Sequence, residues 1–209
     1  MAGVSVSIPH REQVAAAPNA GSMLIQFLIR RRVAISFCLF TAMAVEDILD
    51  GVKPHDVLNF RDVHTLLGMG LMLAGLGLRS WAAGTLRKGE VLATTGPYSV
   101  IRNPLYVGSF LMMFGFCAII DDQENIWFML GPVLGMYLLR IHDEEKGLAT
   151  RFGDAWTKYV RQTPRIFPRR LWPRFSAEWR IAQWTRNREY RAVITTLVAL
   201  VAIKVWRGF

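Results

Sequence analysis

A run of 18 residues without a charged side chain or a histidine, from Asn103 to Ile120, constrains the fold of this chain more than any other feature. As an α-helix it approaches the roughly 20 residues that cross the hydrocarbon core of a bilayer. The start of the run overlaps a motif with two prolines, two tyrosines and an arginine, Gly96-Pro-Tyr-Ser-Val-Ile-Arg-Asn-Pro-Leu-Tyr-Val-Gly108. The sequence therefore places polar and aromatic side chains at a membrane edge, where they meet both water and lipid.

The composition of the 209-residue chain favours a membrane protein, because 52% hydrophobic residues and a mean hydropathy of +0.25 are high for a soluble fold. Five apolar stretches predict spans: Arg32–Leu49, Val63–Leu86, Pro104–Ile120, Ile126–Ile141 and Tyr190–Trp206. The uncharged cores of four of them are short, so flanking arginine and lysine side chains have to extend toward the head groups. A soluble bundle is disfavoured because the segment Leu111 to Ile120 has no polar face. We expect an all-α, multi-pass transmembrane helical bundle of about five spans.

The charges between the predicted spans alternate in sign. Arg30-Arg31-Arg32 precedes the first span and the acidic segment Asp50 to Asp62 follows it. Of the 25 lysines and arginines, only four lie on the same side of the membrane as this acidic segment: Lys53, Arg61, Lys204 and Arg207. The positive-inside rule then predicts an integral membrane protein with a cytoplasmic N-terminus, in the inner membrane if the source is bacterial. The net charge of +9 would attract anionic lipids, and nucleic-acid binding is not expected.

The chain divides into four predicted parts. These are a tail (1–29), a first transmembrane hairpin (30–89), a core with the motifs (90–168), and a basic interfacial helix with a last span (169–209). From His142 to Arg191 there are 12 lysines and arginines against 6 acidic residues, interleaved with tryptophans and tyrosines, as is typical of a lipid interface. Helices are expected at Asp143 to Val160 and Phe175 to Arg188. An interfacial anchor without any further role would have the same composition.

A second motif pairs with the first. It begins at Arg140-Ile-His-Asp-Glu-Glu-Lys-Gly-Leu148 and continues through Phe152-Gly153, Trp156 and Tyr159 to Pro164-Arg-Ile-Phe-Pro168. Both motifs lie at the cytoplasmic edge in the predicted topology. Because only a short acidic loop joins the third and fourth spans, they should form an antiparallel hairpin that brings Arg102 near Arg140. The two segments are therefore expected to share one site.

From Glu90 to Pro168 the chain resembles the integral-membrane methyltransferases typified by isoprenylcysteine carboxyl methyltransferase, a family that includes phospholipid methyltransferases. The family pattern has Gly-Pro-Tyr, then Arg-His-Pro-x-Tyr-x-Gly, then a Glu-Glu pair, Phe-Gly, a tyrosine, and arginine with proline. The resemblance is specific because two separated motifs occur in the family's order.

The resemblance implies S-adenosylmethionine as the methyl donor and a membrane lipid or another lipid-like acceptor as the partner. The implied cofactor contacts are Glu90, Val91, Leu92, Ala93, Tyr98, Asn103, Pro104, Leu105, Tyr106 and Glu144. Arg140 is implied to orient the acceptor, and Glu144 to complete the catalytic site. A carboxylate acceptor fits, because it is ionised at neutral pH and needs only a cationic partner. The protein then mainly orients the reactants and excludes water.

Asn103 departs from the family pattern, which has histidine at this position. Asparagine cannot take up a proton at neutral pH, and this favours an acceptor that is already deprotonated. Three other functions stay open: phospholipid N-methylation, a membrane reductase of the sterol-reductase type that uses NADPH, and a non-enzymatic scaffold. Arg140 and Glu144 could also form a plain surface pair worth about 0.3–0.5 kcal/mol.

No metal site is predicted from the sequence. His55 and His64 lie on the side opposite to the motifs, and His142 is interpreted as a solvated partner of Asp143. The acidic residues that follow the third span, which are Asp121, Asp122 and Glu124, are interpreted as a solvated loop. Cys38 and Cys117 lack metal-ligand spacing and are expected to be small core residues.

Overall fold

The computed structural model describes residues 20–169 and 178–208, and within these residues the regular elements are helices without strands. The predicted all-α class is thereby confirmed. The elements are α1 (Ala20–Leu49), α2 (Val63–Thr85), a 3₁₀ turn (Pro97–Ser99), α3 (Pro104–Ile120), α4 (Gln123–Phe128), a π turn (Met129–Val133), α5 (Leu134–Gln162), α6 (Ile181–Arg186) and α7 (Tyr190–Arg207). Helix α1 begins within the segment predicted to be a tail, and the rest of that tail lies outside the described residues.

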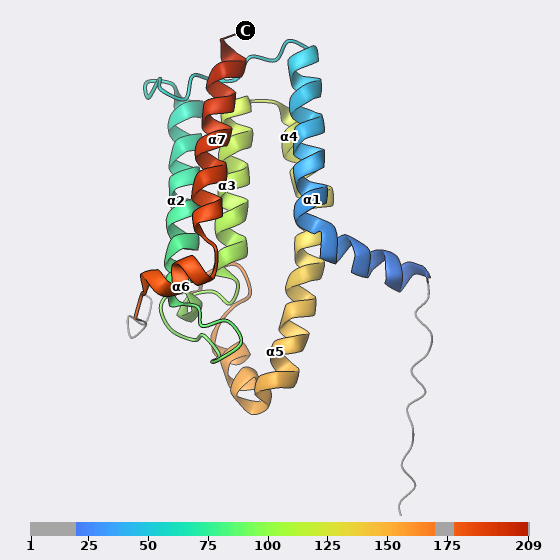
Figure 1. The fold of residues 1–209 in the computed structure, drawn as a ribbon, viewed down its shortest axis with the longest axis vertical. Coiled ribbons are helices and arrows are strands. Elements are labelled where there is room, and N and C mark those ends of the chain that lie inside the picture. Colours follow the sequence, from blue (N-terminus) through green and yellow to red (C-terminus); the bar gives the residue numbers. More distant parts are fainter. Residues whose placement is uncertain (1–19, 170–177, 209) are drawn as a thin grey trace, which may run out of the picture.

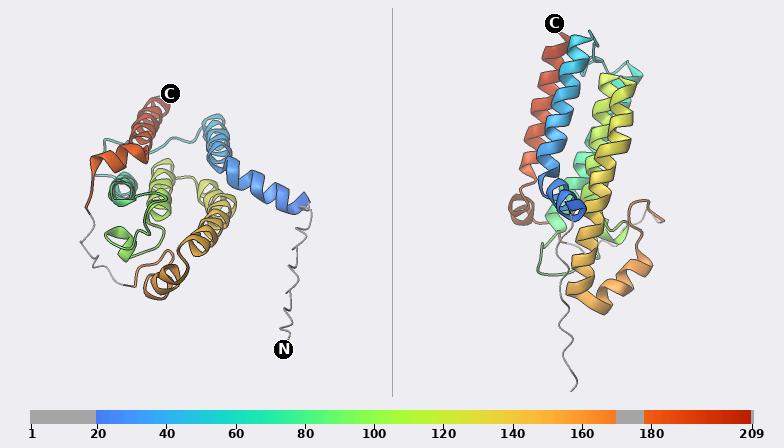
Figure 2. Two further views of the ribbon diagram at one scale, coloured as in Figure 1. Left: turned by 60° about the horizontal axis from the view of Figure 1, so that its bottom comes forward. Right: turned by 90° about the vertical axis from the view of Figure 1, so that its right-hand side faces the viewer.

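The long helices run side by side along the long axis of the molecule (Figure 1). Figure 2 shows α2, α3 and α7 on one side of the bundle and α1, α4 and α5 on the other. Both predicted motifs lie at one end, formed by residues 86–108 and 140–169, which we call the motif end. The loop 50–62, the α3–α4 connection and the end of α7 form the opposite end.

Helices α2 and α3 approach each other most closely through two pairs of glycines. A Cβ atom on Gly75 would lie 2.5 Å from the carbonyl oxygen of Gly108, and one on Gly115 would lie 2.5 Å from the carbonyl oxygen of Gly68. Small residues at such positions let two backbones pack closely, as in many membrane helix pairs. The α2–α3 hairpin is therefore fixed in register along most of its length.

Helices α4 and α5 are continuous through the π turn, and the α-helical geometry is interrupted at two positions. The π turn contains Pro132, which cannot donate a backbone hydrogen bond and crowds the preceding turn, so the helix widens there. Gly153, with φ 47° and ψ −118°, bends α5 sharply near the motif end. The helix predicted for residues 143–160 is thus the second part of a longer one.

Helix α6 packs on the last turn of α2. The Trp179 indole lies against Gly84 and donates a hydrogen bond of 3.0 Å to the Ser80 carbonyl oxygen. The Asn187 amide donates to the carbonyl oxygens of Ala83 and Leu86, at 2.8 and 2.9 Å, and so satisfies groups at the end of α2. Of the helix predicted for residues 175–188, the first three residues lie outside the described part, and α6 forms within the rest.

Among the described helices, α2 alone is long and apolar enough to cross a membrane by length and composition, and α3 is a shorter apolar helix of 17 residues. The predicted number of spans therefore stays a prediction. Large apolar side chains are nonetheless exposed on the outer faces of two helices: Val63, Leu66, Leu67 and Leu73 on α2, and Ile194, Leu197, Val198 and Val201 on α7. Soluble monomers rarely expose such patches, so these faces favour contact with lipid.

Candidate functional site

The two predicted motifs meet at the motif end. The Tyr159 hydroxyl donates a hydrogen bond of 2.7 Å to the Tyr98 carbonyl oxygen. The backbone N–H of Arg102 donates one of 2.9 Å to the Pro164 carbonyl oxygen. The structure thus brings together segments that are about sixty residues apart, as expected from the motifs.

Glu145 is at the centre of this junction and is buried. The Arg165 guanidinium donates to Glu145 Oε2 from Nε and Nη2, at 3.0 and 2.6 Å. Asn103 Nδ2 donates to Glu145 Oε1 at 3.1 Å and to the Arg165 carbonyl oxygen at 3.3 Å. A buried carboxylate is costly unless it is paired and hydrogen-bonded, and both of its oxygens are satisfied here. Asn103 therefore links the two motifs.

Arg102 is held from two sides at the same junction. Its Nε lies 3.6 Å from Glu145 Oε1, and its guanidinium carbon lies 5.8 Å from the centre of the Trp156 ring, within reach of a cation–π contact. The predicted approach of Arg102 to Arg140 takes an indirect form. Arg102 contacts Glu145, whereas Arg140 contacts the adjacent Glu144.

Arg140 and Glu144 form the half-exposed part of the site. Arg140 Nε lies 2.9 Å from Glu144 Oε1, and Arg140 Nη1 donates to Asp143 Oδ2 at 3.1 Å. Arg140 is also hydrogen-bonded to the side chain of Tyr106 on α3. The Tyr106 ring packs edge-on against Tyr137, with 5.7 Å between ring centres. Glu144, Arg140, Tyr106 and Tyr137 thus form a row of side chains, the Arg140 row, that joins α3 to α5.

Tyr98 has a buried hydroxyl group without a hydrogen-bond partner among the described residues. Burial, with smaller contributions from Tyr159 and Glu144, raises the pKa of this phenol well above its usual value. The hydroxyl therefore stays protonated and can donate a hydrogen bond. Leaving such a group unsatisfied costs about 1–3 kcal/mol, so this hydroxyl is a candidate contact for a ligand.

The other implied cofactor contacts fall into two groups. Glu90 and Val91 are exposed, Leu92 and Ala93 are half-buried, and Glu90 binds Arg186 of α6 at 2.8 Å. Pro104 and Leu105 form the first turn of α3, where proline fits because its missing N–H has no partner to lose. Glu90 thus contacts α6, and Pro104 and Leu105 lie beside Asn103 and Tyr106 in the chain.

Arg79 is paired inside the bundle. It forms two hydrogen bonds with buried Glu189, Nε to Oε1 at 2.7 Å and Nη2 to Oε2 at 3.0 Å. Arg79 Nη1 also donates to the Leu105 carbonyl oxygen at 3.3 Å. This paired geometry is the strong form of an ion pair. It ties α2, α3 and the start of α7 together behind the site.

An apolar cavity of about 210 Å³ lies between α2, the segment 97–101 that includes the 3₁₀ turn, α3 and the end of the second motif. Its lining side chains are all apolar: Leu78, Trp81, Pro97, Val100, Ile101, Val107, Ile166 and Pro168. Ligand sites commonly combine such an apolar wall with a few polar groups. The cavity is suited to an apolar part of a ligand.

Glu145 and Arg165 were quoted in the motif but not placed in the predicted site. The helical period contains the missing signal, because Ile141, Glu145 and Leu148 are spaced four and three residues apart and share one face. Ile141 is fully buried in the structure. A carboxylate on a buried face requires a partner, and Arg165 in the Pro164-Arg165 motif provides it.

Comparison with known proteins gives a family for this region. The phospholipid methyltransferase family matches residues 63–155, which contain Tyr98, Asn103, Arg140 and Glu144. The cobalt-zinc-cadmium resistance protein CzcN of Cupriavidus metallidurans is 32% identical over 78% of this chain and 77% of its own length. The nickel-cobalt-cadmium resistance protein NccN of Alcaligenes xylosoxydans xylosoxydans is 31% identical over 72% of this chain and 70% of its own length.

The protein-S-isoprenylcysteine O-methyltransferase of Schizosaccharomyces pombe is 27% identical over 47% of this chain and 42% of its own length. No solved structure is significantly similar to the chain.

Proposed function

Because this chain belongs to the family of membrane methyltransferases that includes isoprenylcysteine carboxyl methyltransferase and the phospholipid methyltransferases, we propose that it transfers a methyl group from S-adenosylmethionine to a lipid-like acceptor. The preferred acceptor group is a carboxylate. The observation that carries the proposal is the unpartnered Tyr98 hydroxyl, buried in the segment where the two family motifs meet; the neighbouring residues Pro97, Val100 and Ile101 line an apolar cavity.

The residues around Tyr98 fit the proposed donor. S-adenosylmethionine, when bound, supplies a methyl group activated by its attachment to a positively charged sulfur. The Tyr98 hydroxyl can donate to an anionic group such as the donor's carboxylate, and Glu144 offers a negative charge to a cation. The rings of Tyr106 and Tyr137 can stabilise a cation through their faces. We assign the remaining contacts to the segments 90–93 and 103–105.

Arg140 is the proposed partner of the acceptor. Its guanidinium can form charge-assisted hydrogen bonds with a carboxylate and hold it in line with the donor. An ionised carboxylate has no proton to lose, so no side chain of this site has to act as a base. This suits a chain in which Asn103 replaces histidine and its amide N–H group is bound to Glu145. The side chains then orient the reactants and exclude water.

The apolar cavity provides a place for the hydrocarbon part of the acceptor. We place the motif end at the cytoplasmic face of a multi-pass bundle. The excess of basic residues at this end and the exposed apolar faces of α2 and α7 support this orientation. An acceptor embedded in lipid could then reach the cavity with its polar head at the Arg140 row.

Phospholipid N-methylation is the second candidate, and the name of the matching family favours it. An amine acceptor has to lose a proton before it attacks, and Asn103 cannot accept one. The carboxylate therefore ranks first. The names of the two metal-resistance relatives state no chemical reaction, so they do not discriminate between acceptors.

Donor binding by the purified chain in detergent tests the proposal, with tritiated S-adenosylmethionine compared against NADPH. Tyr98→Phe removes only the hydroxyl, and Tyr190→Phe, on an exposed tyrosine at the start of α7, is the matched control. We expect Tyr98→Phe to weaken donor binding about ten- to hundredfold, as for a lost hydrogen bond to a charged group, without lowering the melting temperature. The control should bind like the wild type.

Unchanged donor affinity in Tyr98→Phe would contradict the site. Binding of NADPH in place of the methyl donor would support the reductase alternative, and binding of neither compound would support the scaffold. The acceptor is then identified by mass spectrometry of lipids and small amphiphiles that are methylated from labelled donor in membranes with and without the protein.

A further inference from the structure

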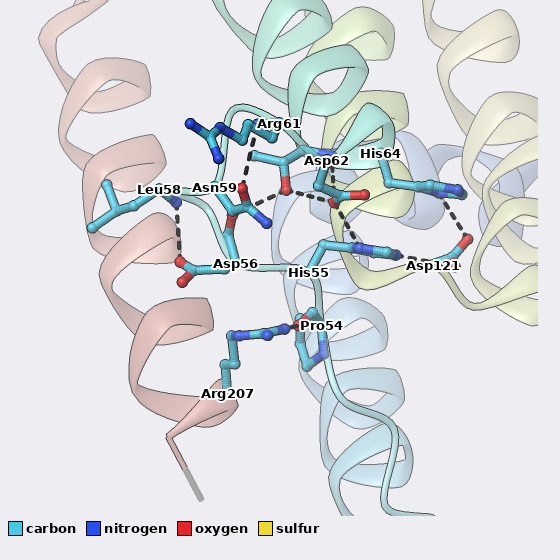
Figure 3. A network of polar contacts seen from close by, with 11 residues as sticks. Pro54, His55, Asp56, Leu58, Asn59, Arg61, Asp62, His64, Asp121 and Arg207 are labelled. Carbon is cyan, nitrogen blue, oxygen red and sulfur yellow. Dashed lines mark hydrogen bonds and ion pairs between the residues drawn. The ribbon is translucent and has the colours of Figure 1, made fainter.

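Two histidines and two aspartates come together at the opposite end of the bundle, away from the methyl-transfer site (Figure 3). His55 Nε2 lies 3.2 Å from Asp121 Oδ2, and His64 Nδ1 lies 3.2 Å from Asp121 Oδ1. The two imidazole rings stack in parallel, with 4.5 Å between their centres and 5° between their planes. One nitrogen of each ring therefore lies close to the Asp121 carboxylate.

We propose that His55, His64 and Asp121 bind one divalent transition-metal ion, with zinc as the reference ion. Their potential ligand atoms all lie within 4.8 Å of one another. Imidazole nitrogen and carboxylate oxygen are ligands that Zn²⁺ and neighbouring metals accept. An ion about 2.1 Å from a nitrogen and an oxygen that are 3.2 Å apart joins them at an angle of about 100°, close to tetrahedral. Because the two rings are parallel, the imidazoles have to tilt toward each other as the ion binds, and a fourth position is then left for water or a substrate.

Asp62 supports the same assignment, because it contacts the ring nitrogen of His55 that does not face Asp121. Its Oδ2 atom lies 2.7 Å from His55 Nδ1. A neutral imidazole carries its proton on one nitrogen, and this carboxylate favours a proton on Nδ1. The lone pair of Nε2 then faces Asp121. Metal-binding histidines typically have such a carboxylate on the second ring nitrogen, where it orients the ring.

The backbone that carries these side chains is fixed by contacts from α3 and α7. The His55 N–H donates to the Ile119 carbonyl oxygen of α3 at 2.8 Å. Asp121 ends α3 with φ 59°, the left-handed conformation in which many helices end and which aspartate adopts more readily than most residues. The end of α7 secures the loop, because Arg207 Nη1 donates to the Pro54 carbonyl oxygen and Lys204 Nζ to Asp56 Oδ1, at 2.5 and 2.7 Å.

Three basic side chains of this end lie away from the cluster. Lys204 and Arg207 bind Asp56 and the Pro54 carbonyl oxygen, and Arg61 points away from the stacked rings in Figure 3. The proposal uses none of the residues assigned to methyl transfer and does not rest on that function. It departs from the sequence-based expectation, which set the histidines aside and interpreted Asp121 as part of a solvated loop.

The test uses the full-length chain, purified in detergent without a polyhistidine tag and treated with a chelator. Zn²⁺ binding is measured by calorimetry, and Co²⁺ binding by visible absorption, which reports the coordination geometry. We expect one ion per chain, and at least a tenfold loss of affinity in His64→Gln and in Asp121→Asn. Asparagine accepts the left-handed backbone conformation at position 121, so this change removes mainly the ligand charge.

Asp62→Asn separates a metal site from a simple hydrogen-bonded cluster. Asparagine caps a helix about as well as aspartate, so the start of α2 is preserved while the carboxylate behind His55 is lost. We expect a ten- to hundredfold loss of affinity, as is usual when such a supporting group is removed. Glu124→Gln, an acidic residue of the same end, and His142→Gln, an exposed histidine of the motif end, are the matched controls and should bind like the wild type.

Failure of Zn²⁺ and Co²⁺ to bind at millimolar concentration would overturn the proposal. Equal losses in the controls and in the cluster variants would also overturn it, since the ion would then bind elsewhere, and so would binding that persists in both His64→Gln and Asp121→Asn. Circular dichroism and melting curves of the metal-free variants establish that each is folded. Should one of these two variants unfold, the other carries the test, because they lie on different helices. His10→Gln accounts for the histidine outside the described residues.

Discussion

Two adjacent glutamates of α5 should separate the stability of the motif junction from donor binding. Glu145 is buried among Arg165, Asn103 and Arg102, whereas Glu144 lies half-exposed beside Arg140. Glutamine has nearly the same shape as glutamate but carries no charge and has a donor in place of one acceptor. We predict that Glu145→Gln destabilises the fold, and that Glu144→Gln weakens the binding of S-adenosylmethionine with little effect on stability.

The contacts of each side chain set the magnitudes. A hydrogen bond to a charged group contributes about 1.5–3 kcal/mol, and Glu145 accepts two from Arg165 and one from Asn103. Glutamine keeps part of this set, and Arg165 is 44% exposed and can be hydrated again, so we expect a loss of about 2 kcal/mol. For a chain of this size the melting temperature should fall by roughly 4–8 °C. The Glu144 pair is worth about 0.3–0.5 kcal/mol, so its loss should lower the melting temperature by less than about 2 °C.

Thermal unfolding in detergent and calorimetric donor binding are measured on both variants and on the wild type. If Glu144→Gln unfolds as early as Glu145→Gln, the two carboxylates do not differ in burial as the structure has them. If Glu144→Gln binds the donor like the wild type, Glu144 is not part of the donor site. Donor affinity of Glu145→Gln is compared well below its melting temperature, so that unfolding does not imitate a loss of binding.

Three further predictions concern helix packing, the acceptor and the topology. Gly75→Ala should destabilise the α2–α3 pair by about 1–3 kcal/mol in thermal unfolding, because its Cβ would meet the backbone of α3, whereas Gly77→Ala, which has open space around it, should be neutral or stabilising. Arg140→Ala should raise the apparent KM for a carboxylate acceptor and leave donor affinity within a few-fold. In the wild type the rate should be nearly flat from about pH 6.5 to 8, whereas a steep rise would indicate an amine acceptor. Labelling of single introduced cysteines should place residues 51–62 on the side of the membrane opposite to the cytoplasm and residues 146–169 on the cytoplasmic side. Labelling of both segments from the same side would contradict the topology.

The helix boundaries could be read from the sequence where local chemistry marks them. Helix α3 covers the predicted residues 104–120, because Pro104 favours the first helical position and the charged Asp121 ends the apolar run. Helix α2 begins at the predicted Val63, where Asp62 accepts a hydrogen bond from the Thr65 N–H as the N-cap. Helix α1 begins before the predicted span at Arg32, because a helix can continue through the three arginines at positions 30–32 that were interpreted as the border of the span.

The depth of individual charged side chains was harder to predict, because it depends on pairs that are far apart in sequence. Arg79 and Glu189 are 110 residues apart, and either alone looks like a residue at a membrane border. Glu145 and Arg165 are only 20 residues apart, but the bend at Gly153 is needed to turn the second half of α5 back toward the first motif. The helical period could have placed Glu145 on a buried face, and the identity of its partner required the fold.

The histidine cluster shows the same limit at the other end of the bundle. His55 lies in a loop, His64 in the first turn of α2 and Asp121 at the end of α3, so their spacing matches no metal motif. They meet because the glycine pairs hold α2 and α3 close in one antiparallel register, which puts the start of α2 beside the end of α3. The loop that carries His55 is then fixed against α3 by its hydrogen bond to the Ile119 carbonyl oxygen. A change in that register, as in Gly68→Ala or Gly115→Ala, should therefore weaken metal binding although neither glycine contacts the cluster, and wild-type affinity in a folded Gly68→Ala chain would contradict this account of how the site is assembled.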